Sequence, residues 1–514
     1  MSKRFPVLLA LLFVTGAAGG SAQAINEAVD LAVLQRIKDE GLNRSRIDDL
    51  AGHLTDVIGG RLTNSPAARR ANDWAAETLR SFGLVNVKLE PWDSAFGRGW
   101  ELERFTAQVV APWTGPLSAY PQAWSGSTMV RGRPGPVTCS VVVLEVRDSN
   151  DLAQYRGRLR DACVMRGAPP VIRPEFEPAA TRYTLDELIN PPPRPPAGGG
   201  PGGPGNPGAF QQAQRLNAMV TQLIRSERPA AVLQSSGWSY NLIRSGGHMD
   251  GRTARDSSYN PVPHILLAHE QYGRLYRVAK RGTPARLELD LRTRFLDDNR
   301  TPTNVIAEIP GGDKADEVVM IGAHFDSWHS GTGATDNGAG SVIMMEAMRI
   351  LKTTGVPLRR TVRIGLWTGE EQGLLGSRSW LRIHRNELPR ISAYLNIDNG
   401  TGRLRGIWDQ SNSAAQPILQ QVLAPLQDLG VVVVSRGNTG GTDHLSFVAA
   451  GVPGFNFRQD AIEYGTRTHH SNVDTYERLV IDDLKQAATV VAWTVYALAN
   501  RPELMPRPVR PATP

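Results

Sequence analysis

The chain has 514 residues, of which 41% are hydrophobic, and this is enough to build the cores of two domains. Its formal net charge of +7 is spread thinly, and no block of Lys and Arg with interleaved aromatic residues occurs, which excludes a nucleic-acid-binding protein. After the N-terminal segment no run reaches about 18 apolar residues, which excludes an integral membrane span.

Residues 1–24 have the composition of a secretory signal peptide. The basic pair Lys3 and Arg4 precedes an apolar run over residues 6–14, and the small residues that follow predict cleavage after Ala24. The apolar run is too short to span a bilayer, and an uncleaved lipid-facing anchor is the alternative. We therefore expect an exported protein, periplasmic or secreted.

Residues 25–114 are expected to form the first part of the catalytic domain. Within them, the segment 58–66 leads into a helix for which Ser65 is a good N-cap and Pro66 suits the first helical position. Gly83 ends the helical pattern, as glycine commonly does.

Residues 115–291 contain short β runs and are expected to form an inserted β-rich domain. The runs cover 137–146, 162–165, 230–233 and 264–267. Residues 190–208 are nearly all Pro and Gly and are predicted to form a mobile surface loop. The chain's two cysteines, Cys139 and Cys163, lie in strand-like segments of this region. In an exported chain they form either a disulfide or two buried thiols.

Residues 292–500 are expected to form the catalytic part of the chain, followed by a disordered Pro-rich tail at 501–514. Three apolar runs of strand length are each followed by side chains that can bind a metal. These runs are 318–323 before His324, 362–367 before Glu370 and Glu371, and 393–397 before Asp398. Because α/β sheets hold ligands at the edge where strands end, we expect these side chains to lie close together.

Together with Asp336 and His470, these residues supply what a pair of zinc ions needs. Zinc prefers imidazole and carboxylate ligands at about 2.0–2.2 Å, and a hydrolytic pair needs ligands to both ions, a bridge and an open position for water. Two histidines and three acids provide that set and leave one glutamate as a base. The adjacent Glu370 and Glu371 are an unfavourable like-charge pair unless a cation or a proton relieves them. One such side chain alone would be structural or merely solvated, but their joint occurrence favours a metal site.

Two aspartates have predicted positions beside the metals. Asp336 leads into the helix predicted for residues 341–351, and a carboxylate at a helix start can point outward and bridge two cations. Asp326 follows His324 by two residues and is placed to accept its second ring N–H, which would fix the tautomer and raise the basicity of the ring.

In combination these motifs resemble the co-catalytic zinc aminopeptidase family, metallopeptidase family twenty-eight, and within it the carboxypeptidase Q branch. The matching motifs are Ala323-His324-Phe325-Asp326, Thr335-Asp336-Asn337-Gly338, Thr368-Gly369-Glu370-Glu371, Asn396-Ile397-Asp398 and His469-His470-Ser471-Asn472-Val473-Asp474-Thr475. The resemblance implies a zinc-site assignment with His324 and Asp398 on one ion, Glu371 and His470 on the other, Asp336 as bridge and Glu370 as general acid/base. The family pattern, in which His is followed by Ser or Thr and then x-x-Asp-Thr, selects His470 rather than His469.

The resemblance also implies a fold. It predicts an α/β protein with a three-layer αβα zinc-peptidase domain around a mixed central sheet. The inserted β-rich domain at 115–291 is expected to be protease-associated-like. A cis peptide bond is implied between Asp336 and Asn337.

The implied function is that of an exported di-zinc exopeptidase, which hydrolyses peptide bonds at the N-terminus of peptides or in dipeptides through a metal-bridged water. Tyr464 would donate a hydrogen bond to the tetrahedral oxyanion. Asp443 and His444 would either line the substrate pocket or belong to a capped loop. The expected partner is a peptide or dipeptide substrate, and a homodimer is compatible with the sequence.

Two other functions compete with this interpretation. A glutaminyl cyclase on the same fold uses a single zinc, and the full second ligand set with His324, Asp336 and Asp398 argues against it. Release of free amino acid rather than ammonia would distinguish the two. A non-catalytic binding protein that kept the fold would not be expected to retain Glu370 and five ligands.

Overall fold

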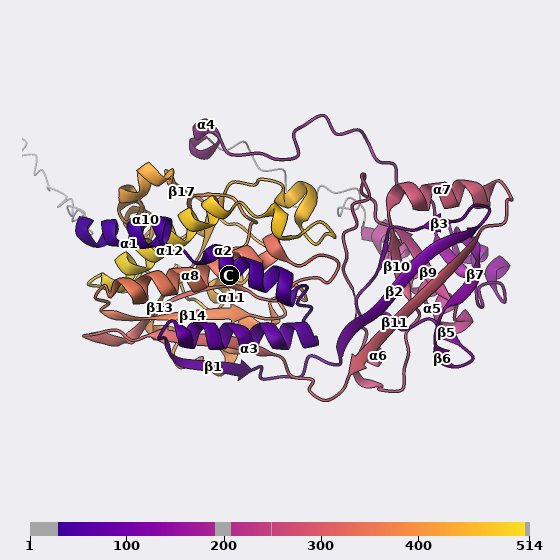
Figure 1. Cartoon of the computed structure of the whole chain (residues 1–514), viewed down its shortest axis with the longest axis horizontal. Coiled ribbons are helices and arrows are strands. Elements are labelled where there is room, and N and C mark those ends of the chain that lie inside the picture. Colours follow the sequence, from indigo (N-terminus) through magenta and orange to yellow (C-terminus); the bar gives the residue numbers. More distant parts are fainter. Residues whose placement is uncertain (1–28, 191–206, 248, 509–514) are drawn as a thin grey trace, which may run out of the picture.

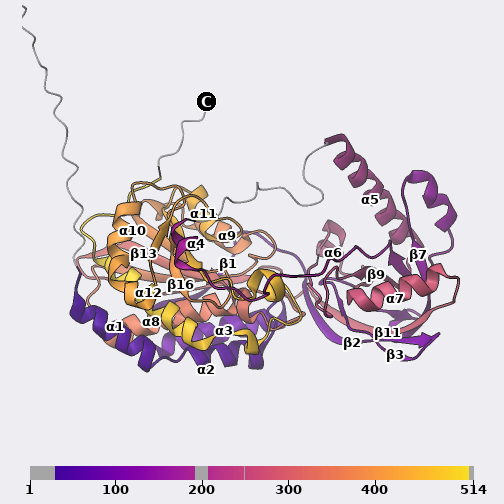
Figure 2. The same cartoon turned by 90° about the horizontal axis from the view of Figure 1, so that it is seen from above.

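The computed structural model describes residues 29–190, 207–247 and 249–508, which form two domains side by side (Figures 1 and 2). Each domain is built on an eight-stranded sheet. The predicted signal peptide at 1–24 lies outside the described residues, as do residues 191–206 of the predicted Pro/Gly loop and residues 509–514 of the predicted tail.

The sheet of the larger domain is mixed, as expected. Its strands, in spatial order, are β1 (Val85–Pro91), β12 (Thr303–Ile309), β14 (Arg360–Trp367), β13 (Lys314–His324), β15 (Ile391–Asn396), β18 (Gly454–Gln459), β16 (Leu404–Trp408) and β17 (Val433–Ser435). The central strands β14, β13, β15 and β18 are parallel, whereas β12 and β16 pair with them antiparallel. The carboxyl ends of the four central strands therefore meet at one edge of the sheet.

Helices cover both faces of this sheet. One face packs against α1 (Leu31–Asn43), α2 (Ile47–Gly52), α3 (Pro66–Ser81), α8 (Ala339–Thr354), α10 (Gln416–Leu423) and α12 (Ile481–Asn500), and the other against α9 (Leu375–Ile383) and α11 (His444–Ala449). Side chains alternate along β13, so that Val319 and Ile321 enter the first core while Met320 packs with Trp380 and Phe447 in the second. The predicted three-layer αβα arrangement is confirmed.

The second domain has its own sheet and its own core. In spatial order the strands are β3 (Gly115–Pro116), β2 (Gly99–Ala111), β11 (Arg286–Leu296), β7 (Val137–Leu144), β8 (Cys163–Arg166), β9 (Ala231–Ser235), β10 (His264–Leu267) and β4 (Ala119–Pro121). The sheet runs from Gly99 to Leu296, beyond the expected 115–291, because β2 and β11 pair along their whole length. The helices of this domain are α5 (Pro207–Glu227), α6 (Gly251–Arg255) and α7 (His269–Lys280), and β5 (Met129–Val130) pairs with β6 (Arg133–Pro134) in a separate hairpin. Helix α5 begins inside the segment that composition predicted as a loop.

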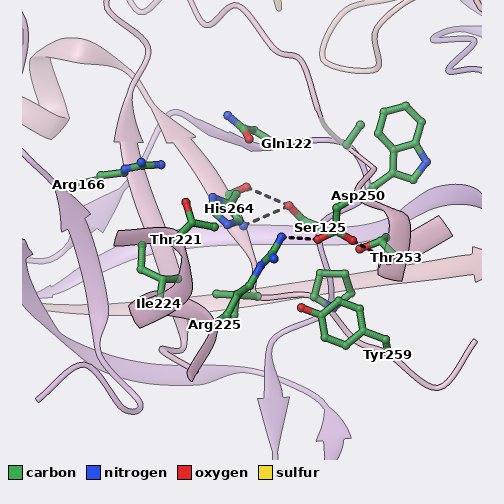
Figure 3. Close-up of a pocket in the computed structure, with 14 residues that line it drawn as sticks. Gln122, Ser125, Arg166, Thr221, Ile224, Arg225, Asp250, Thr253, Tyr259 and His264 are labelled. Atoms are coloured by element: carbon green, nitrogen blue, oxygen red, sulfur yellow. Dashed lines mark hydrogen bonds and ion pairs between the residues drawn. The ribbon is translucent and has the colours of Figure 1, made fainter. Parts of the chain in front are cut away.

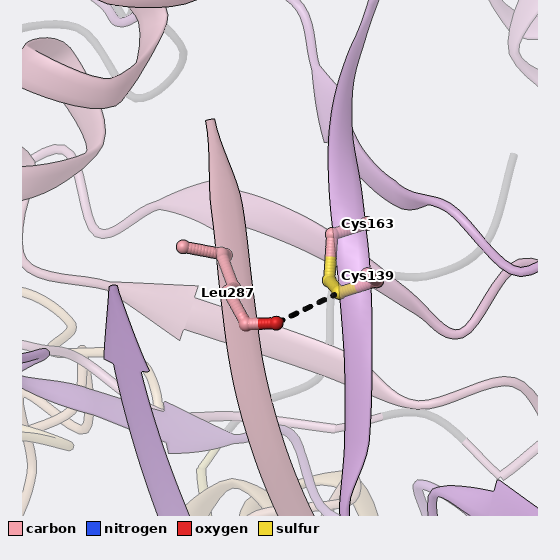
Figure 4. Close-up of a disulfide and its surroundings, with 3 residues drawn as sticks. All are labelled: Cys139, Cys163 and Leu287. Carbon is pink, nitrogen blue, oxygen red and sulfur yellow. Dashed lines mark hydrogen bonds between the residues drawn. A yellow bond between two sulfur atoms is a disulfide. The ribbon is translucent and has the colours of Figure 1, made fainter. Parts of the chain in front are cut away.

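The two cysteines are joined. Cys139 on β7 and Cys163 on β8 lie on neighbouring parallel strands with their Cα atoms 5.4 Å apart, and they form a disulfide. Both residues are buried in the core of the second domain, and Cys139 Sγ lies 3.8 Å from the carbonyl oxygen of Leu287 on β11 (Figure 4). Of the two alternatives that the sequence left open, the structure adopts the disulfide.

Removing this bridge should weaken the second domain. Because the bridge spans a sequence separation of 24, the double substitution Cys139→Ala and Cys163→Ala is expected to lower the free energy of unfolding by about 3 kcal/mol, through the added freedom of the unfolded chain. Denaturant unfolding of the wild type and the double variant measures this difference. Equal midpoints for the wild type with and without reductant would contradict a stabilising bridge.

Two peripheral segments bind to the larger domain. The short helix α4 (Leu185–Ile189) lies over it, although the neighbouring strands in the sequence belong to the second domain (Figure 1). Just before α4, Arg182 forms an ion pair with Asp460 at 3.1 Å. Residues 501–508, predicted to be disordered, are ordered because Met505 is buried and its N–H donates to Ser392 Oγ at 3.0 Å. Among the described helices none combines the length and hydropathy needed to cross a bilayer.

Candidate metal centre

The predicted ligands converge at the edge of the larger sheet where the parallel strands end. His324 is the last residue of β13, Glu370 and Glu371 follow β14, and Asp398 follows β15 by two residues. Asp336 lies in a π-type turn, η3 (Ala334–Gly338), directly before α8. The structure thus brings together the side chains that the sequence placed at separate strand ends.

Asp336 lies at the centre of the cluster, and its two carboxylate oxygens face different partners. Oδ1 is 3.3 Å from His324 Nε2, which is itself 3.3 Å from Asp398 Oδ1. Oδ2 is 3.4 Å from His470 Nε2, which lies 2.9 Å from Glu371 Oε2. One carboxylate therefore joins two donor groups, which is the arrangement a bridging ligand requires.

The turn that carries Asp336 is fixed by its neighbours. The Asp336–Asn337 peptide bond is cis, as the resemblance implies. Asn337 Nδ2 donates to the carbonyl oxygen of Ile397 at 2.8 Å, beside Asp398, and Asn337 Oδ1 accepts the N–H of Gly340 at 3.0 Å. The Asn337 side chain thus ties α8 to the strand end that carries Asp398, another candidate ligand.

Buried carboxylate oxygens without hydrogen bonds show that this donor set fits a cation. Asp336 Oδ2 and Glu371 Oε1 are both buried and lack a hydrogen bond from any described residue. Burial raises the pKa of Glu371 well above its usual range, and the neighbouring carboxylates of Asp336, Asp326 and Asp398 add to this effect. Grouped buried carboxylates of this kind are costly unless a metal ion neutralises them. Imidazole and carboxylate are also the donors that zinc prefers.

The two adjacent histidines differ in their contacts. His470 reaches both Glu371 and Asp336, whereas His469 Nε2 lies 3.8 Å from Asp336 Oδ2 and forms no ion pair with Glu371 in the described chain. The rings lie with their centroids 3.8 Å apart, and that of His469 also contacts Tyr464. Both rings are near the Asp336 carboxylate, and the distances favour His470 as the candidate ligand.

Asp326 takes a different position from the one predicted. The ring nitrogen Nδ1 of His324 is 3.0 Å from the main-chain carbonyl oxygen of Asp326. The nearer carboxylate oxygen of Asp326, Oδ1, is 3.7 Å from the same nitrogen. The carboxylate instead accepts from Thr63 Oγ1 at 2.8 Å and from the main-chain N–H groups of Glu370 and Glu371 at 3.2 and 3.4 Å. Asp326 thus orients His324 through its main chain and holds the glutamate turn with its side chain.

Glu370 and Tyr464 face a cavity of about 500 Å³ beside the cluster. The cavity is lined by Asp336, Glu370, Glu371, Gly373, Leu374, Asp398, Asn399, Gly440, Gly441, Leu445, Tyr464, His469 and His470. Burial raises the pKa of Glu370 well above its usual range, and the nearby carboxylates oppose the lowering effect of His324. Tyr464 donates to Asp398 Oδ1 at 3.4 Å. This is the concave space in which a substrate can meet both the cluster and a free carboxylate.

Asp443 and His444 do not line this cavity. Both are fully buried, while the flanking Gly440, Gly441 and Leu445 form the wall. His444 Nε2 bonds to the carbonyl oxygen of Thr439 at 3.0 Å, and burial raises the pKa of Asp443 to about 7. The structure therefore places both side chains beneath the surface, which corresponds to the structural alternative for this loop.

The sequence did not single out Arg61 as part of the site. Its fully buried guanidinium donates to four main-chain carbonyls, at distances of 2.7–3.0 Å, those of Gly59, Phe325, Thr332 and Gly333. Burial lowers its pKa only to about 10, so it remains a cation. Three of these carbonyls belong to the loop between His324 and Asp336, and Arg61 therefore holds that loop in place. Its only sequence signal was its position in the segment before α3.

Asp474 supports the same loop from the opposite end of the chain. Its carboxylate accepts the main-chain N–H groups of Thr335 at 2.7 Å and Asp336 at 3.1 Å. The Asp474 side chain of the histidine motif thus positions the backbone of Asp336, the candidate bridge. Asp474 and Asp336, far apart in the sequence, are thus held in contact.

A carboxylate shared by two groups of imidazole and acid donors, at the carboxyl edge of an αβα sheet, defines a hydrolytic metal centre. Residues 304–495 match the family model described as Peptidase family M28. Carboxypeptidase Q of Mus musculus is 33% identical over 91% of this chain and 88% of that protein, and carboxypeptidase Q of Rattus norvegicus is 27% identical over 95% and 96%. The chain belongs to peptidase family M28 and is a zinc metallopeptidase, as the resemblance implied.

Solved structures agree with the fold. A peptidase M28 precursor from Shewanella amazonensis SB2B is 25% identical and matches with a TM-score of 0.66 over 93% of this chain and 99% of that chain. BSAP, a zinc aminopeptidase from Bacillus subtilis, has a TM-score of 0.56 at 18% identity over 88% and 93%. The two-domain architecture of this chain therefore has a full-length counterpart of known structure.

Proposed function

We propose that the protein is an exported di-zinc exopeptidase, which hydrolyses the peptide bond at the N-terminus of peptides or in dipeptides. The observation that supports two ions is the geometry of Asp336, whose oxygens face the donor pair of His324 and Asp398 on one side and that of Glu371 and His470 on the other. Each side offers imidazole and carboxylate in the combination that zinc takes in hydrolytic sites.

Zinc in this centre would polarise the scissile carbonyl and make water acidic enough to attack it near neutral pH. Glu370 lines the cavity and is not one of the proposed zinc ligands. It would therefore accept the proton of the attacking water and return it to the leaving amine nitrogen. The hydroxyl of Tyr464 borders the same cavity and would donate to the tetrahedral oxyanion. Acidic groups around the cavity would attract the free ammonium of a peptide N-terminus and so restrict cleavage to chain ends.

Export is supported by two independent features. Residues 1–24 have the composition of a signal peptide. The disulfide between Cys139 and Cys163 suits an oxidising compartment, because such bridges are rare where thiols are kept reduced.

The purified protein is expected to contain two zinc ions per chain and to lose its activity to a chelator, because each half of the centre has its own ligands. Elemental analysis measures the zinc, and a panel of amino-acid amides and dipeptides measures the activity before and after chelation. Full activity with one ion or none would overturn the di-zinc proposal. Release of ammonia from a dipeptide that begins with Gln, without release of free amino acid, would indicate a glutaminyl cyclase instead.

A further inference from the structure

The second domain contains a cavity that shares no lining residue with the metal centre. Its volume is about 180 Å³, and it lies between β8, α5, α6 and β10 (Figure 3). The side chains that give it its chemistry are Arg166, Thr221, Ile224, Arg225, Asp250 and His264. Polar and apolar groups from four separate elements thus face one cavity.

The charges around this cavity do not balance. Arg225 and Asp250 form an ion pair with each other, drawn as a dashed line in Figure 3, and Asp250 also accepts the N–H of Thr253 at 2.7 Å. Arg166 donates to the side-chain oxygen of Asn217, and none of the ion pairs in the described part of the chain includes it. The lining therefore carries one positive charge in excess at neutral pH.

His264 adds an uncharged donor and acceptor to the wall. Its main-chain N–H donates to Ser125 Oγ at 3.1 Å, whereas its imidazole has no hydrogen-bond partner among the described residues and borders the cavity. Burial and the cations Arg166 and Arg225 lower the pKa of this imidazole to about 4, so the ring is neutral at pH 7. A neutral imidazole can donate one hydrogen bond and accept another.

We propose that this cavity binds a compact organic anion, with a carboxylate or phosphate head on Arg166 and a short apolar body against Ile224 and Val262. A guanidinium presents paired N–H groups that match both oxyanions. The volume is below the roughly 300–1,000 Å³ of sites for drug-sized ligands, which suits a molecule of only a few heavy atoms. The proposal is independent of the peptidase function.

The test is a calorimetric titration of the zinc-loaded full chain with butyrate, with inorganic phosphate and with neutral butyramide. One of the two anions is expected to bind saturably, which identifies the head group, while butyramide is expected not to bind. Arg166→Gln should weaken anion binding by about tenfold or more, because a charge-assisted pair is lost. The matched control Arg215→Gln removes the same charge from an exposed position on α5 and should leave binding unchanged.

Three outcomes would overturn the proposal: no saturable binding of either anion, equal affinity in the wild type and Arg166→Gln, or equal losses in Arg166→Gln and Arg215→Gln. Anion binding at the metal centre is separable, because Arg166 does not line it. Where Arg166→Gln fails to fold, Thr221→Phe serves as the second variant, since it fills the cavity from α5 and keeps the arginine. Thr221→Phe should abolish the anion binding, and undiminished binding by this variant would also contradict the proposed site.

Discussion

Replacing Glu370 with glutamine is expected to reduce turnover by a factor of about 10² to 10⁴ while leaving the zinc content intact, because the amide cannot take up a proton. Glu370 lines the cavity of about 500 Å³, and its main-chain N–H is held at 3.2 Å by Asp326. The substitution keeps the shape of the side chain and this main-chain bond. Its effect should therefore fall on proton transfer rather than on the construction of the site.

The adjacent residue provides the matched control. Glu371 is the same residue type in the same turn, but its Oε2 lies 2.9 Å from His470 Nε2 and its Oε1 is buried without a partner. Glu371→Gln is thus expected to lose zinc together with activity. Steady-state kinetics and elemental analysis of both variants separate the two roles. Near-wild-type turnover in Glu370→Gln would show that another group moves the proton.

The candidate ligands were predictable because they follow local patterns. His324, Glu371 and Asp398 each come after an apolar run of strand length, and parallel strands bring their carboxyl ends to one edge whatever the rest of the chain does. The helix after Asp336 and the helix after Ser65 were likewise visible from periodicity and caps. These features depend on residues close in the sequence.

What the sequence could not give depends on packing between distant segments. Arg61 bonds to Phe325 across 264 positions, and no local pattern distinguishes it from a surface arginine. The main chain rather than the carboxylate of Asp326 meets His324, because the carboxylate is held by Thr63 and the glutamate turn. Residues 501–508 have a composition typical of disorder, yet Met505 is buried beside Ser392.

The expected difference between the two adjacent histidines tests the arrangement of the second zinc. His470→Ala should lower the zinc affinity of one site by about 10- to 100-fold or more. Loss of a contact that supports a ligand already lowers metal affinity by this factor, and loss of a direct ligand should lower it at least as much. His470 Nε2 lies 2.9 Å from Glu371 and 3.4 Å from Asp336, so its removal leaves two acids without their imidazole.

His469→Ala is the matched variant, because it removes the same ring one residue away. Its Nε2 lies 3.8 Å from Asp336 Oδ2, farther than that of His470, and its ring packs on Tyr464 at the cavity wall. Both zinc ions should therefore stay, and the change should appear in the KM and kcat for substrate. Zinc titration of the two variants side by side measures the difference. Equal loss of metal in both variants, or a greater loss in His469→Ala, would mean that His469 is a ligand. The motif-based assignment to His470 would then be wrong by one residue.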